Sequence, residues 1–124
     1  MTCVKSRTWR VVVSSQVIVM TNFSVLRQFG DGVTQDELEM AVDRSNEATE
    51  SMREDGHAIS YIGSDVFVDG EGSIVATICR YDAESERDVR EQSERGELPV
   101  SGIYREGDPV EANAPLTGVA SKAR

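Results

Sequence analysis

The chain has 124 residues, of which 39% are hydrophobic and 28% charged, enough for one domain with a single core. The net charge of −9 and the absence of any run of positive charge argue against a nucleic-acid partner. The apolar stretch near the N-terminus is too short and too interrupted to span a bilayer, so no membrane association is expected.

The charges are distributed unevenly along the chain. All 22 acidic residues lie between Asp31 and Glu111. Residues 20–112 contain eight arginines and no lysine, so eight positive charges against 22 negative ones give −14. Such a surface is expected of a halophilic protein, because concentrated salt screens the repulsion between carboxylates. The alternative is an ordinary acidic cytosolic protein.

The two cysteines stand in different contexts and are not expected to form a disulfide. Cys3 lies in the N-terminal tail, and Cys79 lies in a predicted buried strand, where a free thiol packs as a small apolar group. A reduced, cytoplasmic location is therefore predicted.

The first 19 residues differ from the rest of the chain. Their two valine-rich runs are separated by Ser14-Ser15-Gln16, and no small-residue cleavage site follows, so a signal peptide is not predicted. We expect an extension upstream of the domain, arising from a misassigned start codon. The alternative is an extra edge strand from Arg10 to Val19. The domain is expected over residues 20–110, and residues 111–124 are expected to be a disordered tail.

The first half of the domain is predicted to form a strand and a long helix. Alternation predicts a strand from Phe23 to Phe29 that ends at Gly30-Asp31-Gly32. Thr34 and Glu37 form a capping box at the start of a helix that runs to Asp55, with Gly56 as its stop. The apolar face of this helix is expected to comprise Leu38, Ala41, Val42, Ser45, Ala48, Thr49 and Met52.

The second half of the domain is predicted to form two strands, a helix and a last strand. A strand is predicted over residues 57–68 with a bulge at Gly63, followed by a hairpin loop over residues 69–72. Residues 73–81 are expected to form a central strand. Asp82 is predicted to cap a helix that runs to residue 94 or 95, anchored by Ala83 and Val89 and stopped by Gly96. Residues 101–105 form the last predicted strand.

This order, strand, helix, strand, strand, helix, strand, is the split βαβ arrangement of the ferredoxin-like α+β sandwich. Two helices are expected on one face of a four-stranded antiparallel sheet. The other face is expected to leave apolar side chains such as Ile59, Tyr61 and Phe67 or their neighbours uncovered, which favours a homodimer that closes face to face.

Several segments of the core resemble a known family. These are Ser60-Tyr61-Ile62, residues 79–86, Val89-Arg90-Glu91, residues 96–99 and Ile103-Tyr104. Over residues 22–110 the chain resembles an uncharacterised, domain-of-unknown-function family of small ferredoxin-like proteins that includes a nickel-binding protein. The resemblance implies a compact dimeric α/β sandwich, with metal binding as a possible but not a general property.

The chain departs from that family at one position. Members of the family often carry a histidine shortly after the Val-Arg-Glu stretch, where this chain has Gln92 and Ser93. That departure removes the most attractive metal ligand that the resemblance implies.

The residues themselves offer one candidate metal site. His57, the only histidine, could join Cys79 and a carboxylate such as Asp65 to bind nickel or zinc, although no ligand-spacing motif supports the set. The alternative is that His57 caps the preceding helix or faces water, and that Cys79 packs in the core. The carboxylates crowded at residues 84–94 are interpreted as a solvated acidic face.

A second candidate site involves aromatic and basic residues of the sheet. Tyr61, Arg80, Tyr81 and Arg27 could line a space enclosed by a dimer and bind a small anionic or aromatic ligand. The alternative is cross-strand packing with ion pairs to nearby carboxylates. No phosphate-binding loop or Ser-His-Asp arrangement is visible, and no residue is assigned a catalytic role.

The sequence therefore favours a cytoplasmic, non-enzymatic dimer that binds a metal ion or a small ligand. One alternative is a dimeric monooxygenase or isomerase that uses a pocket between subunits. Another is a protein–protein interaction module that uses its sheet face.

Overall fold

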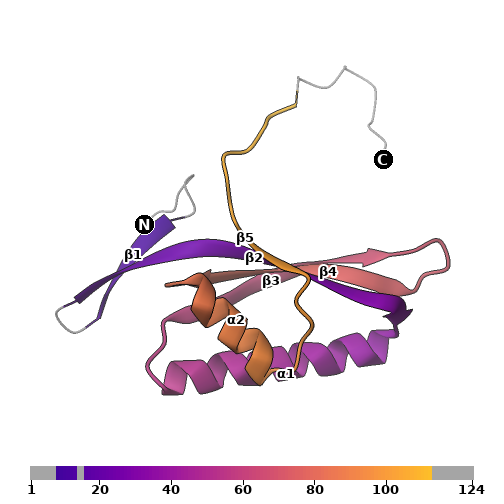
Figure 1. Cartoon of the computed structure of the whole chain (residues 1–124), viewed down its shortest axis with the longest axis horizontal. Coiled ribbons are helices and arrows are strands. Elements are labelled where there is room, and N and C mark those ends of the chain that lie inside the picture. The colour runs from indigo at the N-terminus through magenta and orange to yellow at the C-terminus, as the bar shows by residue number, and fades with distance from the viewer. Residues whose placement is uncertain (1–7, 14–15, 113–124) are drawn as a thin grey trace.

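The computed structural model describes residues 8–13 and 16–112, with side-chain detail from residue 18 onward. The elements in chain order are β1 (Thr8–Val13), β2 (Gln16–Val33), α1 (Gln35–Glu54), β3 (Ile59–Val68), β4 (Ile74–Ala83), α2 (Glu86–Arg95) and β5 (Gly102–Arg105). The strands of the described chain form one antiparallel sheet in which β2 and β4 are central (Figure 1).

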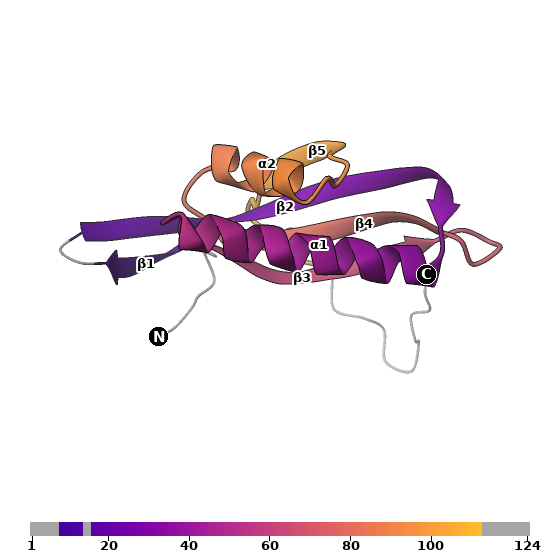
Figure 2. The same cartoon turned by 90° about the horizontal axis from the view of Figure 1, so that it is seen from below.

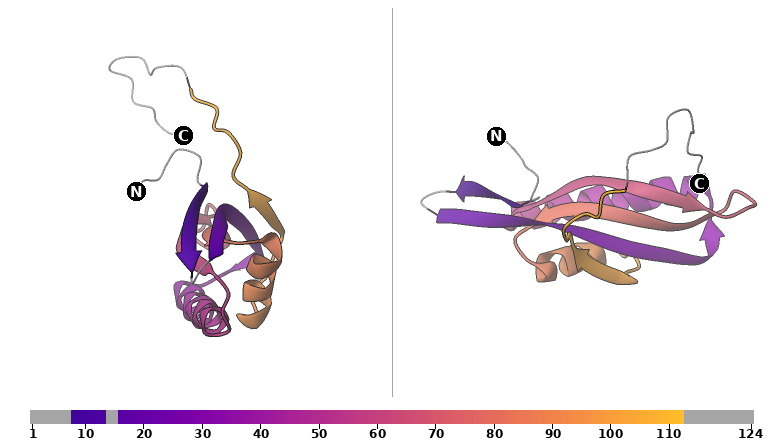
Figure 3. Two further views of the ribbon diagram at one scale, coloured as in Figure 1. Left: turned by 90° about the vertical axis from the view of Figure 1, so that its left-hand side faces the viewer. Right: turned by 90° about the horizontal axis from the view of Figure 1, so that it is seen from above.

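The topology is that of a ferredoxin-like sandwich. β2 pairs with β5 on one side and with β4 on the other, and β4 pairs with β3, giving the order β5-β2-β4-β3. Both helices cover the same face of this sheet, as the view along the strands shows (Figure 3). α1 lies along the length of the sheet, and α2 lies beside it next to β5 (Figure 2). The fold predicted from the sequence is confirmed.

The segment before the domain adds a hairpin to the sheet. β1 pairs with the first six residues of β2, from Thr8↔Thr21 to Val13↔Gln16. The paired strands continue past the end of α1 (Figure 1). Residues 1–7 and 113–124 lie outside the described part of the chain, and with them Cys3 and most of the predicted tail.

The first strand of the domain is longer than predicted at both ends, since β2 begins at Gln16 and not at Phe23. β2 does not end at Gly30 but continues to Val33 through a bulge, where the pairing passes from Gln28↔Ala76 to Val33↔Ile74. Gly30 and Gly32 have positive φ angles of 61° and 108°, so the glycines that indicated a turn accommodate the bulge instead.

The second helix also begins later than predicted. Asp82 lies in β4, where its Oδ1 accepts a hydrogen bond from Asn22 Nδ2 at 2.9 Å. Ser85 is the N-cap of α2, and its Oγ accepts from the Asp88 backbone N–H at 3.2 Å. Aspartate and serine are both common N-cap residues. The hydrogen bond with Asn22 of β2 holds Asp82 in the sheet.

Other local predictions are confirmed. Thr34 and Glu37 form both hydrogen bonds of the capping box at the start of α1. The bulge at Gly63 appears as a register shift between Tyr61 and Gly63 in the pairing with β4. The hairpin between β3 and β4 closes with the Asp69 N–H donating to the Ser73 carbonyl at 2.9 Å.

The core lies between the helices and the sheet. Met52 of α1, Val89 of α2 and Tyr81 of β4 are fully buried in it, together with Phe23 and Val25 of β2. Burial of such an aliphatic side chain contributes about 1.5–3 kcal/mol. The first half of α1 packs less closely, since Leu38 is half-buried and Val42 is 36% exposed.

Candidate metal centre

The turn after α1 fixes the position of His57. Gly56 adopts a φ of +96°, which glycine alone enters without steric cost. Its N–H donates to the Arg53 carbonyl at 3.0 Å, and the His57 N–H donates to the Met52 carbonyl at 3.0 Å. These two bonds form the Schellman motif that ends many helices. The backbone of His57 is therefore held at the C-terminal end of α1.

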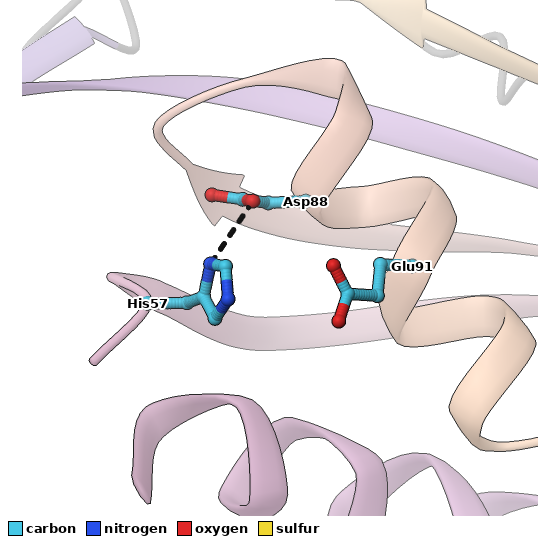
Figure 4. Close-up of side chains that lie close together, drawn as sticks. All are labelled: His57, Asp88 and Glu91. Carbon is cyan, nitrogen blue, oxygen red and sulfur yellow. Dashed lines mark ion pairs between the residues drawn. The ribbon is translucent and has the colours of Figure 1, made fainter. Parts of the chain in front are cut away.

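The first turns of α2 supply two carboxylates on one side. Asp88 and Glu91 are three residues apart, a spacing that places their side chains next to each other on a helix. Asp88 lies in the first turn, where the partial positive charge of the helix N-terminus stabilises a carboxylate. Both carboxylates face the turn that carries His57 (Figure 4).

The three side chains converge on one small region. His57 Nδ1 lies 3.1 Å from Asp88 Oδ1, and each of the three residues offers a ligand atom within 4.8 Å of the others. The His57 side chain is 33% exposed and that of Asp88 only 10%, so the cluster is open on the histidine side. Within the described residues, no other histidine, cysteine or acidic residues form such a group.

Arg95 borders the cluster and shares one of its carboxylates. Its Nε donates to Glu91 Oε2 at 3.0 Å, one turn along α2, and its Nη1 lies 2.9 Å from Asp55 Oδ2. The hydrogen bond with Glu91 raises the pKa of the Arg95 guanidinium, helped by Asp55. Arg95 therefore ties α2 to the end of α1 and competes with any cation for Glu91.

The donor set fits a divalent first-row metal ion. An imidazole nitrogen with two carboxylate oxygens suits nickel or zinc, and binding two carboxylates would offset the charge of the ion. Ligand atoms about 2.1 Å from one ion are about 3 Å apart when adjacent and about 4.2 Å when opposite. The ligand atoms of the three side chains lie within 4.8 Å of one another, close to the larger of these two spacings.

The structure does not bring together the three metal ligands suggested by the sequence. His57 contacts Asp88, whereas Cys79 is buried in the core beside Ser64 and Thr77. Asp65 accepts a hydrogen bond from Arg80 at 2.8 Å across β3 and β4. Alternating strand residues point to opposite faces, so Cys79 and Asp65 project away from each other.

The aromatic and basic set is brought together only in part. Arg27 Nη2 donates to the Tyr81 hydroxyl at 3.1 Å, and the rings of Tyr61 and Tyr81 are 5.3 Å apart. Arg27, Tyr61 and Tyr81 lie beneath the helices, not on the open face of the sheet. Ile59, which was expected on the open face together with Tyr61, is 2% exposed and belongs to the same core. Arg80 lies on that open face, paired with Asp65. The alternative interpretation, cross-strand packing with ion pairs to carboxylates, describes the Tyr61–Tyr81 and Arg80–Asp65 contacts, whereas Arg27 contacts neutral groups.

Sequence reasoning missed Asp88 and Glu91 as partners of His57. Both were included in an acidic face expected to be solvated, yet Asp88 is 7% exposed. Their three-residue spacing was the available signal. It did not indicate which side of α2 meets the end of α1.

Gln92, which stands where the family resemblance led us to expect a histidine, has a structural role here. Gln92 is fully buried, and its Nε2 donates to the Ser45 carbonyl, Ser45 Oγ and Thr49 Oγ1 at 3.0–3.2 Å. It joins α2 to α1 and does not belong to the cluster around His57.

The fold matches a solved structure. The crystal structure of SCO4226 from Streptomyces coelicolor A3(2) superposes with a TM-score of 0.54 at 16% identity, covering 73% of this chain and 99% of that chain. No curated protein is similar enough in sequence to count as a relative. In the described residues, no helix is long and apolar enough to cross a membrane.

The sequence model of one family matches residues 23–105, a range that begins within β2 and ends with β5. That range includes both helices and all three residues of the cluster. The chain belongs to the family described as nickel responsive protein, SCO4226-like.

Proposed function

We propose that this protein binds a divalent first-row cation, with nickel as the first choice, through His57, Asp88 and Glu91. The observation that carries the proposal is the convergence of one imidazole and two carboxylates from the end of α1 and the start of α2. The family description favours nickel, and the imidazole favours a transition metal over magnesium or calcium.

The arrangement favours reversible binding over permanent structural retention. Glu91 is shared with Arg95, and His57 is partly open to solvent, so an ion has an entry path and a competitor. When bound, the ion would supply a positive charge that joins the end of α1 to α2. Such a link is a simple means of responding to the metal concentration.

Calorimetric titration of nickel into the full chain, purified without a histidine tag, tests the proposal. Asp88→Asn and Glu91→Gln keep the side-chain size but remove one carboxylate each, and each is expected to weaken binding at least about tenfold. Glu94→Gln is the matched control, because Glu94 is exposed on the same helix outside the cluster.

Equal nickel affinity in the wild type and in both cluster variants would place the metal elsewhere. No saturable binding of nickel, zinc or copper by the wild type would end the metal proposal. A loss of affinity in Glu94→Gln as large as in Glu91→Gln would mean that only the general charge of α2 matters.

We also propose that the protein is a homodimer that pairs through the open face of the sheet. Strand register places Leu26, Ile78, Phe67 and Tyr104 on this face, and Phe67 and Tyr104 are 44% and 58% exposed. Native mass spectrometry would report the subunit number. A monomer would remove this proposal and also the alternative of an enzyme with a pocket between subunits.

A further inference from the structure

A buried arginine in the centre of the fold lacks a negative partner. Arg27 is 2% exposed, and its Nη1 donates to Ser93 Oγ at 3.0 Å and to the Pro99 carbonyl at 2.9 Å. Its Nη2 donates to the Tyr81 hydroxyl, and its Nε has no hydrogen-bond partner. No carboxylate of the described residues forms an ion pair with it.

Neutral partners leave the positive charge of Arg27 uncompensated. A buried charge without a counter-ion is unfavourable by several kcal/mol even when it is hydrogen-bonded. Tyr81 does not supply the negative charge, because burial raises the pKa of its phenol and holds it neutral. The site is therefore complementary to an anion.

Arg27 lines a cavity of about 50 Å³ between the first half of α1 and the sheet. The other walls are mostly apolar and include Phe29 of β2, Leu38 and Val42 of α1, and Val66 of β3. Val42 and Val66 are 36% and 46% exposed, so the cavity opens toward solvent between α1 and β3.

We propose that this cavity binds a small carboxylate with a short apolar tail. The carboxylate would pair with the guanidinium of Arg27, and the tail would lie against Leu38, Val42 and Val66. A water molecule needs roughly 10–15 Å³ by the same measure, so a space of about 50 Å³ has room for the head group. The tail occupies the opening.

This site is separate from the cluster around His57, because none of the three cluster residues lines the cavity. It also lies on the helix-covered face of the sheet, so a single subunit suffices. The Nε of Arg27 is buried and has no hydrogen-bond partner, so the carboxylate can pair with it only when the side chains that cover it move.

Titration of the metal-free full chain with hexanoate and with 1-hexanol, followed by ¹H–¹⁵N NMR spectra, tests the proposal. Hexanoate is expected to bind saturably and at least about tenfold more tightly than the alcohol, with shifts concentrated around residues 27, 41–45 and 64–66. Arg27→Met should abolish that preference and leave weak binding of both compounds.

A second variant keeps the test decisive if Arg27→Met does not fold. Ala41 lines the cavity, so Ala41→Leu should fill it and weaken hexanoate binding at least about tenfold while Arg27 remains. Met40→Leu, an exposed neighbour on α1 outside this cavity, should bind as the wild type does. Equal binding of hexanoate and hexanol, no binding of hexanoate, or unchanged binding in Ala41→Leu would overturn the proposal.

Discussion

At the scale of single residues, Tyr81 joins three parts of the core. Its hydroxyl is within hydrogen-bond distance of Ser45 of α1 at 3.0 Å and of Arg27 of β2, while its ring contacts Tyr61. Burial disfavours the charged phenolate more than the guanidinium of Arg27 and the hydroxyl of Ser45 stabilise it, so the pKa of Tyr81 is raised. The ionisation of Tyr81 is therefore coupled to folding.

Burial raises the pKa of Tyr81 above its usual value of 10.0, so the folded state holds this proton at a pH where the unfolded chain has lost it. The stability that the proton contributes is complete below pH 10 and is lost as the pH rises through the folded pKa. Tyr81→Phe should lower the free energy of unfolding by about 1 kcal/mol at pH 7.

Urea unfolding at pH 9 and at pH 11 would measure this effect. The wild type should lose more stability between the two values than Tyr81→Phe does. Tyr104→Phe, at a tyrosine that is 58% exposed, is the control and should follow the wild type. Equal losses in the wild type and in Tyr81→Phe would show that Tyr81 does not govern the alkaline limit.

At the scale of elements, the turn at the end of α1 determines the position of His57. The two hydrogen bonds of its Schellman motif require the positive φ of Gly56. Gly56→Ala should lower the free energy of unfolding by about 1–2 kcal/mol, because a Cβ disfavours that conformation. It should also weaken nickel binding, since the turn holds His57 against α2.

Gly70→Ala is the matched control, because Gly70 lies in a hairpin loop with open space around its Cα and no positive φ. Urea unfolding and nickel titration of both variants give the comparison. If Gly56→Ala unfolds with the same free energy as Gly70→Ala, the turn does not constrain the chain as described.

The elements also show which signals in the sequence were sufficient. The capping box at Thr34 and the stop at Gly56 act through neighbouring residues, so local pattern alone predicted the ends of α1. Gly30 and Asp82 were misread because their roles depend on a partner strand. A glycine serves a turn or a bulge equally well, and only the pairing with β4 distinguishes them.

The candidate site shows the same limit. The sequence identified His57 as a candidate, because it is the only imidazole in the chain. It did not identify Asp88 and Glu91 among the many carboxylates of α2, because the side of α2 that faces α1 depends on tertiary packing. Val89 and Gln92 determine that side through their burial, and their pattern is too short to predict it.

At the scale of the whole molecule, the dominant property is the net charge of −9. Repulsion among exposed carboxylates opposes the compact state, and salt screens it with a Debye length of about 10 Å at 0.1 M. We expect the urea midpoint to rise steadily as sodium chloride is increased from 0.1 to 2 M. A midpoint that falls over this range would contradict the proposed adaptation to concentrated salt.

The central claim is that His57, Asp88 and Glu91 hold a metal ion, and a crystal soaked in nickel would test it most directly. Diffraction data collected at the nickel absorption edge should show one strong anomalous peak between the end of α1 and the start of α2, bonded to His57. The absence of a peak at these three residues, or a peak confined to other residues, would contradict the account.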